Sequence, residues 1–313
     1  MAFEIIRPAT HAEWLAERGK GIGSSEVGTI LGVNPWDTPL KLWRRKMGID
    51  PPVEENEAML MGHLLEDAVA RRWEIATDKQ VIKASQGDWI MVDKERKHLR
   101  VSPDRTYWIA GEKHNQQNKG ILECKTTMLD IDEDTIPKSW FCQLMYQLGV
   151  AGYREGSLAW LKMGRTFGTK HYESKPDFYA WMVEELDRFW TDNILGGKEP
   201  EAITAEDVML KNPKHEPGKV VEATEELYQG YERLKDIKAK IAELTGEKDG
   251  IEEQIKLAMG DAEAIEYGGM TLATWKAPKD SQKFDDKALK EADPDTWAKY
   301  LKTVQGARRF TTK

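Results

Sequence analysis

Cysteine is scarce in this chain, since Cys124 and Cys142 are the two that occur among 313 residues. Two cysteines can form neither a disulfide framework nor the four-thiolate set of a structural zinc or iron–sulfur site, so we expect reduced, buried thiols. Long hydrophobic runs are also lacking, and the first residues, MAFEIIRPATHAEW, contain no apolar segment of the signal-peptide kind. These absences predict a cytoplasmic protein that does not act at a membrane.

Positive charge is in the minority, with 46 Lys and Arg residues against 54 Asp and Glu residues, which gives a net charge of −8. This balance does not indicate a nucleic-acid-binding protein, but such binding needs only a local positive patch. Two segments are locally basic, KLWRRKMG at 41–48 and KERKHLRVSPDR at 94–105. The charge pattern is therefore neutral on DNA as a partner.

Hydrophobic residues make up 40% of the chain, and 12 of them are Trp, which is typical of a well-packed globular protein. Helices are predicted from Glu54 to about Ala76, from Pro137, and over 177–195. The strands expected as neighbours in a meander are VIKA at 81–84, DWIMVD at 88–93, LRVSPDRTYWI at 99–109 and GILECKTT at 120–127. We predict an α/β core over residues 1–205, with a central mixed sheet flanked by helices.

The composition changes after Pro200, where KNPKHEPGKV carries two prolines and a glycine and helps to predict a linker over 206–220. Residues 221–313 are expected to form a second module. A heptad-like run rich in Glu and Lys predicts a helical hairpin, or one long helix interrupted near Gly246 and Gly250.

EAIEYGGMTLATWK then predicts a β-hairpin that turns at Gly268 and Gly269. A heptad-like run favours helix pairing within or between chains. Docking of a partner and guidance of DNA through Arg308 and Arg309 are the alternatives. We favour a structural or oligomerising role for this module.

The stretch GILECKTT contains Leu122 and Cys124 in alternation with Glu123 and Lys125, which is the period of a strand with one apolar and one polar face. Asp104 is expected beside this strand. Two carboxylates from adjacent strands can hold Mg²⁺, which prefers oxygen ligands, and Mn²⁺ shares these ligands. Lys125 could orient or help to deprotonate the attacking water, or stabilise charge on a phosphate.

Glu66, midway along the helix that begins at Glu54, could supply a third carboxylate for a second ion. A lone Glu-x-Lys on a strand is usually a surface ion pair. Here, however, a helical Glu, an SPD sequence, a Glu-Cys-Lys strand and a helix bearing Gln follow one another in the order of the PD-(D/E)xK nuclease core. Five blocks occur in that order: RGKGIGSSEVGTILGVNPW, MGHLLEDAV, VSPDR, GILECKTT and QLMYQLGV. Together, over residues 10–195, they resemble the phage lambda exonuclease-like, or YqaJ-type, viral recombinase family.

The resemblance implies a site for two Mg²⁺ ions, with ligands at Glu66, Asp104, Glu123 and the backbone carbonyl of Cys124. Lys125 matches the catalytic lysine of the family, and Gln143 matches the glutamine of the following helix. Gln147, one turn further on, is a weaker candidate because a glutamine on a helix is usually solvated.

In this family an Arg near the end of the first helix, followed by a Ser, clamps the terminal 5′-phosphate of DNA, and Arg18 and Ser25 fall at matching positions. Arg grips phosphate with a bidentate fork, and Ser24 and Ser25 at a helix start offer hydroxyl and N–H groups. Ser24 is the expected N-cap. The alternative for Arg18 is an ordinary cation at a helix C-terminus.

The resemblance implies a Mg²⁺-dependent 5′-to-3′ exonuclease that digests linear double-stranded DNA and leaves a 3′ overhang for phage-type recombination by strand annealing. It also implies a homo-oligomer, typically a trimeric ring around DNA, a single-strand annealing protein as partner, and a phage or mobile-element origin in a bacterial host. One alternative is a PD-(D/E)xK endonuclease of different polarity, which would not depend on Arg18. The other is a non-catalytic scaffold that binds DNA ends.

Overall fold

The computed structural model describes residues 3–82, 89–304, 306 and 308–312. Residues 83–88, which include parts of the predicted strands 81–84 and 88–93, lie outside the described residues. The chain divides into two compact units, Met1–Pro213 (unit 1) and Lys214–Lys313 (unit 2). Within the described part of the chain, no helix has both the length and the apolar character that a membrane span requires.

A mixed five-stranded sheet, with strand order β2-β5-β6-β7-β8, forms the centre of unit 1. Its strands are β2 (Val81–Ile82), β5 (Arg105–Trp108), β6 (Lys119–Thr127), β7 (Glu155–Lys162) and β8 (Thr166–Glu173). All neighbours are antiparallel except β6 and β7, which run parallel and are joined through helix α5 (Lys138–Ala151). The predicted mixed central sheet is confirmed.

The predicted meander is wrong, because its strands belong to two sheets. A second, three-stranded sheet contains β1 (Phe3–Ile6), β3 (Ile90–Asp93) and β4 (Arg100–Val101), in the order β1-β3-β4. The segment 99–109 is therefore two strands, β4 and β5, separated by Ser102, Pro103 and Asp104. Proline lacks an N–H for a strand ladder, which favours a break at Pro103.

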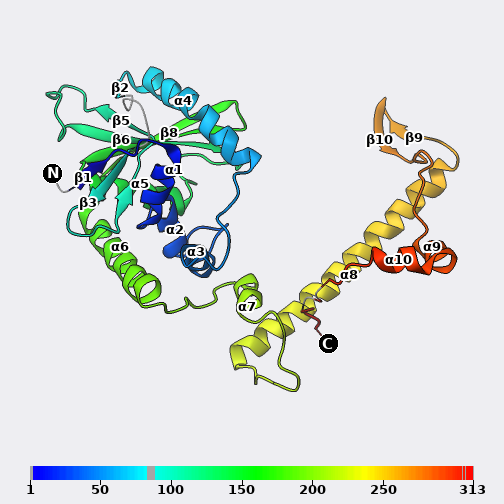
Figure 1. The fold of residues 1–313 in the computed structure, drawn as a ribbon. Coiled ribbons are helices and arrows are strands. Elements are labelled where there is room, and N and C mark those ends of the chain that lie inside the picture. The colour runs from blue at the N-terminus through cyan, green and yellow to red at the C-terminus, as the bar shows by residue number, and fades with distance from the viewer. Residues whose placement is uncertain (1–2, 83–88, 305, 307, 313) are drawn as a thin grey trace. The chain divides into compact units, whose positions relative to one another are not determined.

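Helices cover both faces of the central sheet (Figure 1). Helix α4 (Glu57–Thr77) packs Val69 and Trp73 against Tyr107 and Leu122, whereas α5 on the opposite side belongs to a larger apolar cluster. The remaining helical segments of unit 1 are α1 (His11–Gly19), a 3₁₀ turn (Ser24–Glu26), α2 (Val27–Ile30), α3 (Pro39–Lys46), α6 (Pro176–Arg188), a π-helical segment (Phe189–Leu195) and α7 (Ala205–Lys211).

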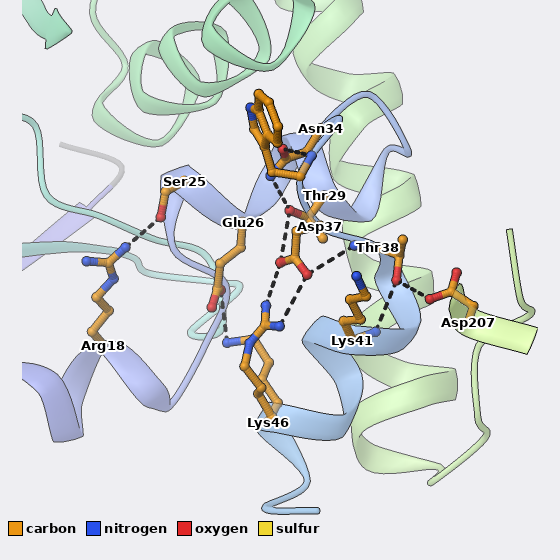
Figure 2. A network of polar contacts seen from close by, with 12 residues as sticks. Arg18, Ser25, Glu26, Thr29, Asn34, Asp37, Thr38, Lys41, Lys46 and Asp207 are labelled. Carbon is orange, nitrogen blue, oxygen red and sulfur yellow. Dashed lines mark hydrogen bonds and ion pairs between the residues drawn. The ribbon is translucent and has the colours of Figure 1, made fainter. Parts of the chain in front are cut away.

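Helix α7 (Ala205–Lys211) occupies the first part of 206–220, where the sequence predicts a linker. Asp207 is fully buried and accepts a hydrogen bond of 2.7 Å from the Thr38 hydroxyl at the start of α3 (Figure 2). Its other carboxylate oxygen accepts from the backbone N–H groups of Ile203 and Thr204. A buried carboxylate is costly unless hydrogen-bond donors surround it, and one of its three donors is Thr38 at the start of α3. This contact fixes α7 against α3.

Unit 2 consists of α8 (Glu225–Met259), a hairpin of β9 (Ala264–Tyr267) and β10 (Met270–Thr274), α9 (Asp286–Ala292) and α10 (Pro294–Lys299). The hairpin turns at Gly268 and Gly269, where the sequence predicts it, and both glycines have positive φ. The predicted helical hairpin is wrong, and the alternative of one long helix is correct except for its interruption, because α8 is one continuous helix of 35 residues. A glycine inside a helix costs only about 1 kcal/mol relative to alanine, so Gly246 and Gly250 do not end it.

Candidate active site

Nine of the residues singled out by the sequence line one cleft of unit 1, with a volume of about 950 Å³. They are Arg18, Ser24, Ser25, Glu66, Asp104, Glu123, Cys124, Lys125 and Gln143. Residues far apart in the sequence meet here because α1, α4, α5 and two adjacent strands of the central sheet converge at this cleft.

Strand β6 separates its side chains between two faces, as the alternation predicts. Leu122 and Cys124 belong to the apolar cluster beneath α4. Glu123 and Lys125 instead reach the side chain of Gln143 on α5. The polar face of β6 therefore points to the cleft side of α5.

The Glu123 carboxylate is 1% exposed and is held by three donors. Its Oε1 accepts from Gln143 Nε2 at 2.5 Å and lies 2.7 Å from the Lys125 ammonium, and its Oε2 accepts from Gln147 Nε2 at 2.7 Å. Gln143 Oε1 in turn accepts from Lys125 Nζ at 3.0 Å. This closed set fixes the orientation of the acid, the lysine and the amide together.

Asp104 is the residue directly before β5, the strand that pairs with β6, and its side chain reaches the backbone of β6. Its Oδ2 accepts a hydrogen bond of 2.7 Å from the backbone N–H of Cys124. The pKa of Asp104 is raised well above its ordinary value by burial and by the negative charges of Glu123 and Glu66, although Lys125 opposes this. The negative charges of these three carboxylates are therefore only partly neutralised by Lys125.

Glu66, on α4, is the third acidic residue of the cleft. It forms an ion pair with Arg105, whose guanidinium also bonds the Asp67 carboxylate at 2.7 Å and the Asp104 carbonyl oxygen at 2.5 Å. Burial raises the pKa of Glu66, and Arg105 acts in the opposite direction. Sequence reasoning missed Arg105, whose position directly after Asp104 was the available signal.

The donor chemistry of the cleft fits a hard divalent cation, because carboxylate oxygens gather there, and burial and the charge of Glu123 raise the pKa of both Glu66 and Asp104. Among the residues that the structure describes, however, no group of three or more His, Cys, Asp or Glu side chains is close enough to hold a metal ion. The reason is visible in the contacts: Glu66 is bound to Arg105, and Glu123 is bound to Lys125 and two glutamines. The structure brings the predicted ligands to one cleft but not into one ligand set.

Arg18 and Ser25 meet at the same cleft. Arg18 Nη2 donates to the Ser25 hydroxyl at 2.6 Å (Figure 2), and the guanidinium lies 5.0 Å from the centre of the Trp14 ring. A Cβ on Gly23 would come within 3.2 Å of the Arg18 guanidinium, so the absence of a side chain there gives the Arg room. Exposed Ser25 and half-buried Arg18 together present a hydroxyl and a planar cation, which suits an anionic oxygen group.

Ser24 has a different environment from that predicted. It is the first residue of the 3₁₀ turn, with Gly23 as the N-cap, and its side chain is buried. Its Oγ accepts from Gln147 Nε2 at 3.3 Å, on the inner side of the cleft wall.

Gln147 connects the two ends of the site and is fully buried, which contradicts the expectation of a solvated residue. Its Nε2 donates both to Glu123 and to Ser24, and its Oε1 has no hydrogen-bond partner among the described residues. The available signal was its spacing of four residues from Gln143, which puts both amides on one face of α5.

The two locally basic segments do not form an uncompensated positive patch. All of their Lys and Arg side chains except Lys94 form ion pairs within the described part of the chain: Lys41–Glu206, Arg44–Asp50, Arg45–Asp37, Lys46–Glu26, Arg96–Asp187, Lys97–Glu4, Arg100–Glu17 and Arg105–Glu66. Arg18 bonds a hydroxyl instead of a carboxylate in its contact with Ser25.

The chain is similar to known proteins in sequence and in fold. Residues 13–154 match the YqaJ-like viral recombinase domain. The chain is 36% identical over 314 residues to protein YqaJ of Bacillus subtilis (strain 168), covering 96% of this chain and 93% of that protein. Among solved structures, the alkaline exonuclease LHK-Exo of Laribacter hongkongensis matches 64% of this chain and 96% of its own at 19% identity, with a TM-score of 0.44. Its complex with dAMP has the same coverage at 18% identity, with a TM-score of 0.46.

Proposed function

Because this chain belongs to the YqaJ-like viral recombinase family, we propose that it is a Mg²⁺-dependent 5′-to-3′ exonuclease of linear double-stranded DNA, which leaves a 3′ overhang for recombination by strand annealing. The observation that carries the proposal is that the bonded set of Glu123, Lys125 and Gln143 lines the same cleft as the Arg18–Ser25 pair. This combination suits hydrolysis of a phosphodiester near a terminal phosphate. We also propose a ring-shaped homo-oligomer around the DNA and a single-strand annealing protein as partner.

In this proposal Glu66, Asp104 and Glu123, with the Cys124 carbonyl, would hold the metal, and Glu66 would exchange its ion pair with Arg105 for the ion. When bound, Mg²⁺ supplies Lewis-acid stabilisation of the charge that develops on the phosphodiester. With the cation bound, the negative charges of these carboxylates would attract the ion, and their mutual repulsion would be neutralised.

Lys125 acts as a cationic donor. Burial by itself lowers the pKa of Lys125, but the charges of Glu123 and Asp104 raise it above its ordinary value, which favours the ammonium form in the metal-free protein. A protonated lysine can orient the attacking water or stabilise a phosphate oxygen, but it cannot accept the proton of that water. Gln143 keeps the ammonium in position through its Oε1.

The proposed function is tested by incubation with Mg²⁺ and three DNA substrates: linear duplex with a 5′-phosphate, linear duplex with a 5′-hydroxyl, and a covalently closed circle. We expect rapid loss of the phosphorylated linear DNA, slower loss of the hydroxyl form and an intact circle, with no digestion in EDTA. Cutting of the circle would establish an endonuclease instead. Binding of DNA ends without cleavage of any substrate would establish a scaffold.

Replacement of Arg18 by alanine is expected to slow digestion of 5′-phosphorylated ends by about 10- to 100-fold, because the terminal phosphate loses a charge-assisted hydrogen bond. Digestion of 5′-hydroxyl ends should change little, so the preference for phosphate disappears. Initial rates on the two linear substrates measure this. Arg165→Ala, at an exposed turn between β7 and β8, removes the same charge and should leave both rates unchanged. An equal loss on both substrates would disprove the phosphate role.

Replacement of Gln147 by alanine should lower the rate about 10-fold, because Glu123 loses the donor to its Oε2. Gln147 acts through Glu123 and is therefore a positioning residue, so the Mg²⁺ concentration for half-maximal rate should also rise. Titration of the rate against Mg²⁺ measures both effects, with Gln117→Ala in an exposed loop as the matched control. A lower melting temperature with unchanged Mg²⁺ dependence would mean that Gln147 has only a packing role.

A further inference from the structure

Helix α8 carries a stripe of large apolar side chains that unit 2 leaves exposed. Six of them are between 37% and 64% exposed: Leu227, Ile237, Ile241, Leu244, Ile251 and Ile255. All residues of α8 are described, and Met259 is the one that is buried. A 35-residue helix with an exposed apolar stripe along its length is typical of a helix that pairs with another.

The stripe follows a heptad repeat over the whole helix. With Leu227 as the first a position, the a positions are Leu227, Leu234, Ile241, Lys248 and Ile255, and the d positions are Gly230, Ile237, Leu244, Ile251 and Ala258. Seven of these ten positions hold Leu or Ile. A hydrophobic repeat of seven residues, which corresponds to 3.5 residues per helical turn, is typical of a left-handed coiled coil.

The flanking charges change sign along the helix. At the e and g positions the first half carries Glu226 at its start and then Arg233, Lys238 and Lys240, and the second half carries Glu247 and Glu252. We propose that α8 pairs with α8 of a second copy of this chain as an antiparallel two-stranded coiled coil. In that arrangement the basic half of each helix lies against the acidic half of the other.

The fully overlapped antiparallel register places Ile241 against Leu244 of the second copy at the centre. Lys240 then lies beside Glu247 of the second copy, and the two-fold axis repeats this pair. Lys248 lies opposite Ile237 of the second copy, and its flexible stem can carry the ammonium out to solvent.

A parallel pair is disfavoured by the same residues. It would place Arg233 beside Lys238 of the second copy, and Glu247 beside Glu252 of the second copy, both of which are like charges. Lys248 would also meet its own copy inside the seam, where like charges are poorly solvated. The sequence of α8 therefore selects orientation as well as pairing.

The rest of unit 2 does not cover the stripe. The C-terminal tail lies beside α8, where Lys238 Nζ bonds the Thr312 hydroxyl (Figure 1). Phe310, the large apolar residue of that tail, is itself 88% exposed. The exposed fractions of the stripe already include the tail, so the surface is open to a second copy.

Charge reversal on the full-length protein tests the pairing. Lys240→Glu and Glu247→Lys should each raise the dissociation constant between copies joined through α8 by about 10- to 100-fold, because two attractive pairs become repulsive. An equimolar mixture of the two variants should associate as tightly as the wild type, since only the mixed pair is again complementary. Sedimentation equilibrium measures all three. The variants change exposed residues of a helix, so circular dichroism should show unchanged helicity.

Cysteine crosslinking tests the orientation. Leu227→Cys combined with Ala258→Cys in one chain should give disulfide-linked dimers, whereas Leu227→Cys alone should not. The two positions are about 46 Å apart along one helix at 1.5 Å per residue, so a disulfide within the chain is excluded. The native Cys124 and Cys142 are buried.

Three outcomes would overturn the proposal. Dimers from Leu227→Cys alone would indicate a parallel pair. Failure of the charge-reversed mixture to recover association would mean that these charges do not meet across copies. An unchanged mass of Ile241→Asp/Leu244→Asp relative to the wild type would mean that α8 binds a different partner or none. In the proposed pairing this double variant loses the contact through α8, and its mass falls to that of the assembly that unit 1 forms alone.

Discussion

Replacement of Lys125 by alanine should lower the rate of DNA digestion by about 10²- to 10⁴-fold, the range for loss of a positioned donor in a transition state. The ammonium lies 2.7 Å from Glu123 and 3.0 Å from Gln143, so it is held where a phosphate oxygen or the attacking water would meet it. Because its pKa is raised, Lys125 carries its charge throughout the neutral range. Single-turnover digestion of 5′-phosphorylated linear DNA measures the effect.

The Lys125 variant should also have a distinctive thermal stability. Without metal, Glu123 loses its cation and remains as a buried carboxylate, so the melting temperature should fall. Added Mg²⁺ should reduce this difference, because the ion supplies the missing positive charge. Lys119→Ala, at the other end of β6, is the matched control and should keep the wild-type rate. A Lys125→Ala variant with the wild-type rate would remove Lys125 from the reaction.

The sequence predicted those features of the site that depend on local periodicity. The alternation in β6 assigned Glu123 and Lys125 to one face, and the assignment is correct because a strand has a fixed period of two. The position of Asp104 beside β6 is also as expected, although the meander that led to it is wrong. β5 and β6 are consecutive antiparallel strands that pair with each other. This pairing does not depend on β3 and β4, which belong to the second sheet.

The contacts that the sequence did not predict all join distant elements. Gln147 is buried because β6 and Ser24 happen to pack on that face of α5, and periodicity does not identify the neighbour of a helix. Arg105 reaches Glu66 across 39 residues for the same reason. The helical hairpin was predicted from Gly246 and Gly250, but propensity is a weak local term and the other residues of α8 outweigh it.

Replacement of Asp104 by asparagine should abolish most activity and yet raise the thermal stability of the metal-free protein. Asparagine is nearly the same size and can still accept the hydrogen bond from the Cys124 N–H. It carries no charge to repel Glu123 and Glu66, the carboxylates that raise the pKa of Asp104. We expect a gain of a few degrees in melting temperature at neutral pH, equivalent to about 1 kcal/mol.

The pH dependence of this effect has a defined sign. A carboxyl whose pKa is higher in the folded than in the unfolded protein binds its proton more tightly when folded. Its charge therefore destabilises the folded state at neutral pH, and the penalty disappears as the pH falls through the raised pKa towards the unfolded value of about 4. The stability advantage of Asp104→Asn should shrink over the same interval. Asp130→Asn, an exposed residue paired with Lys162, is the control and should show no advantage at neutral pH.

Magnesium should reverse the order of the two proteins. An ion that binds only the folded state stabilises it by RT ln(1 + [L]/Kd), and the wild type has the ligand that the variant lacks. The wild type should therefore melt below Asp104→Asn in EDTA and above it in excess Mg²⁺, while the variant digests DNA about 10³-fold more slowly. An equal Mg²⁺ stabilisation of both would show that Asp104 is not a ligand. A destabilised variant in EDTA would show that its charge is already compensated, and the carboxylate repulsion inferred for this cleft would be wrong.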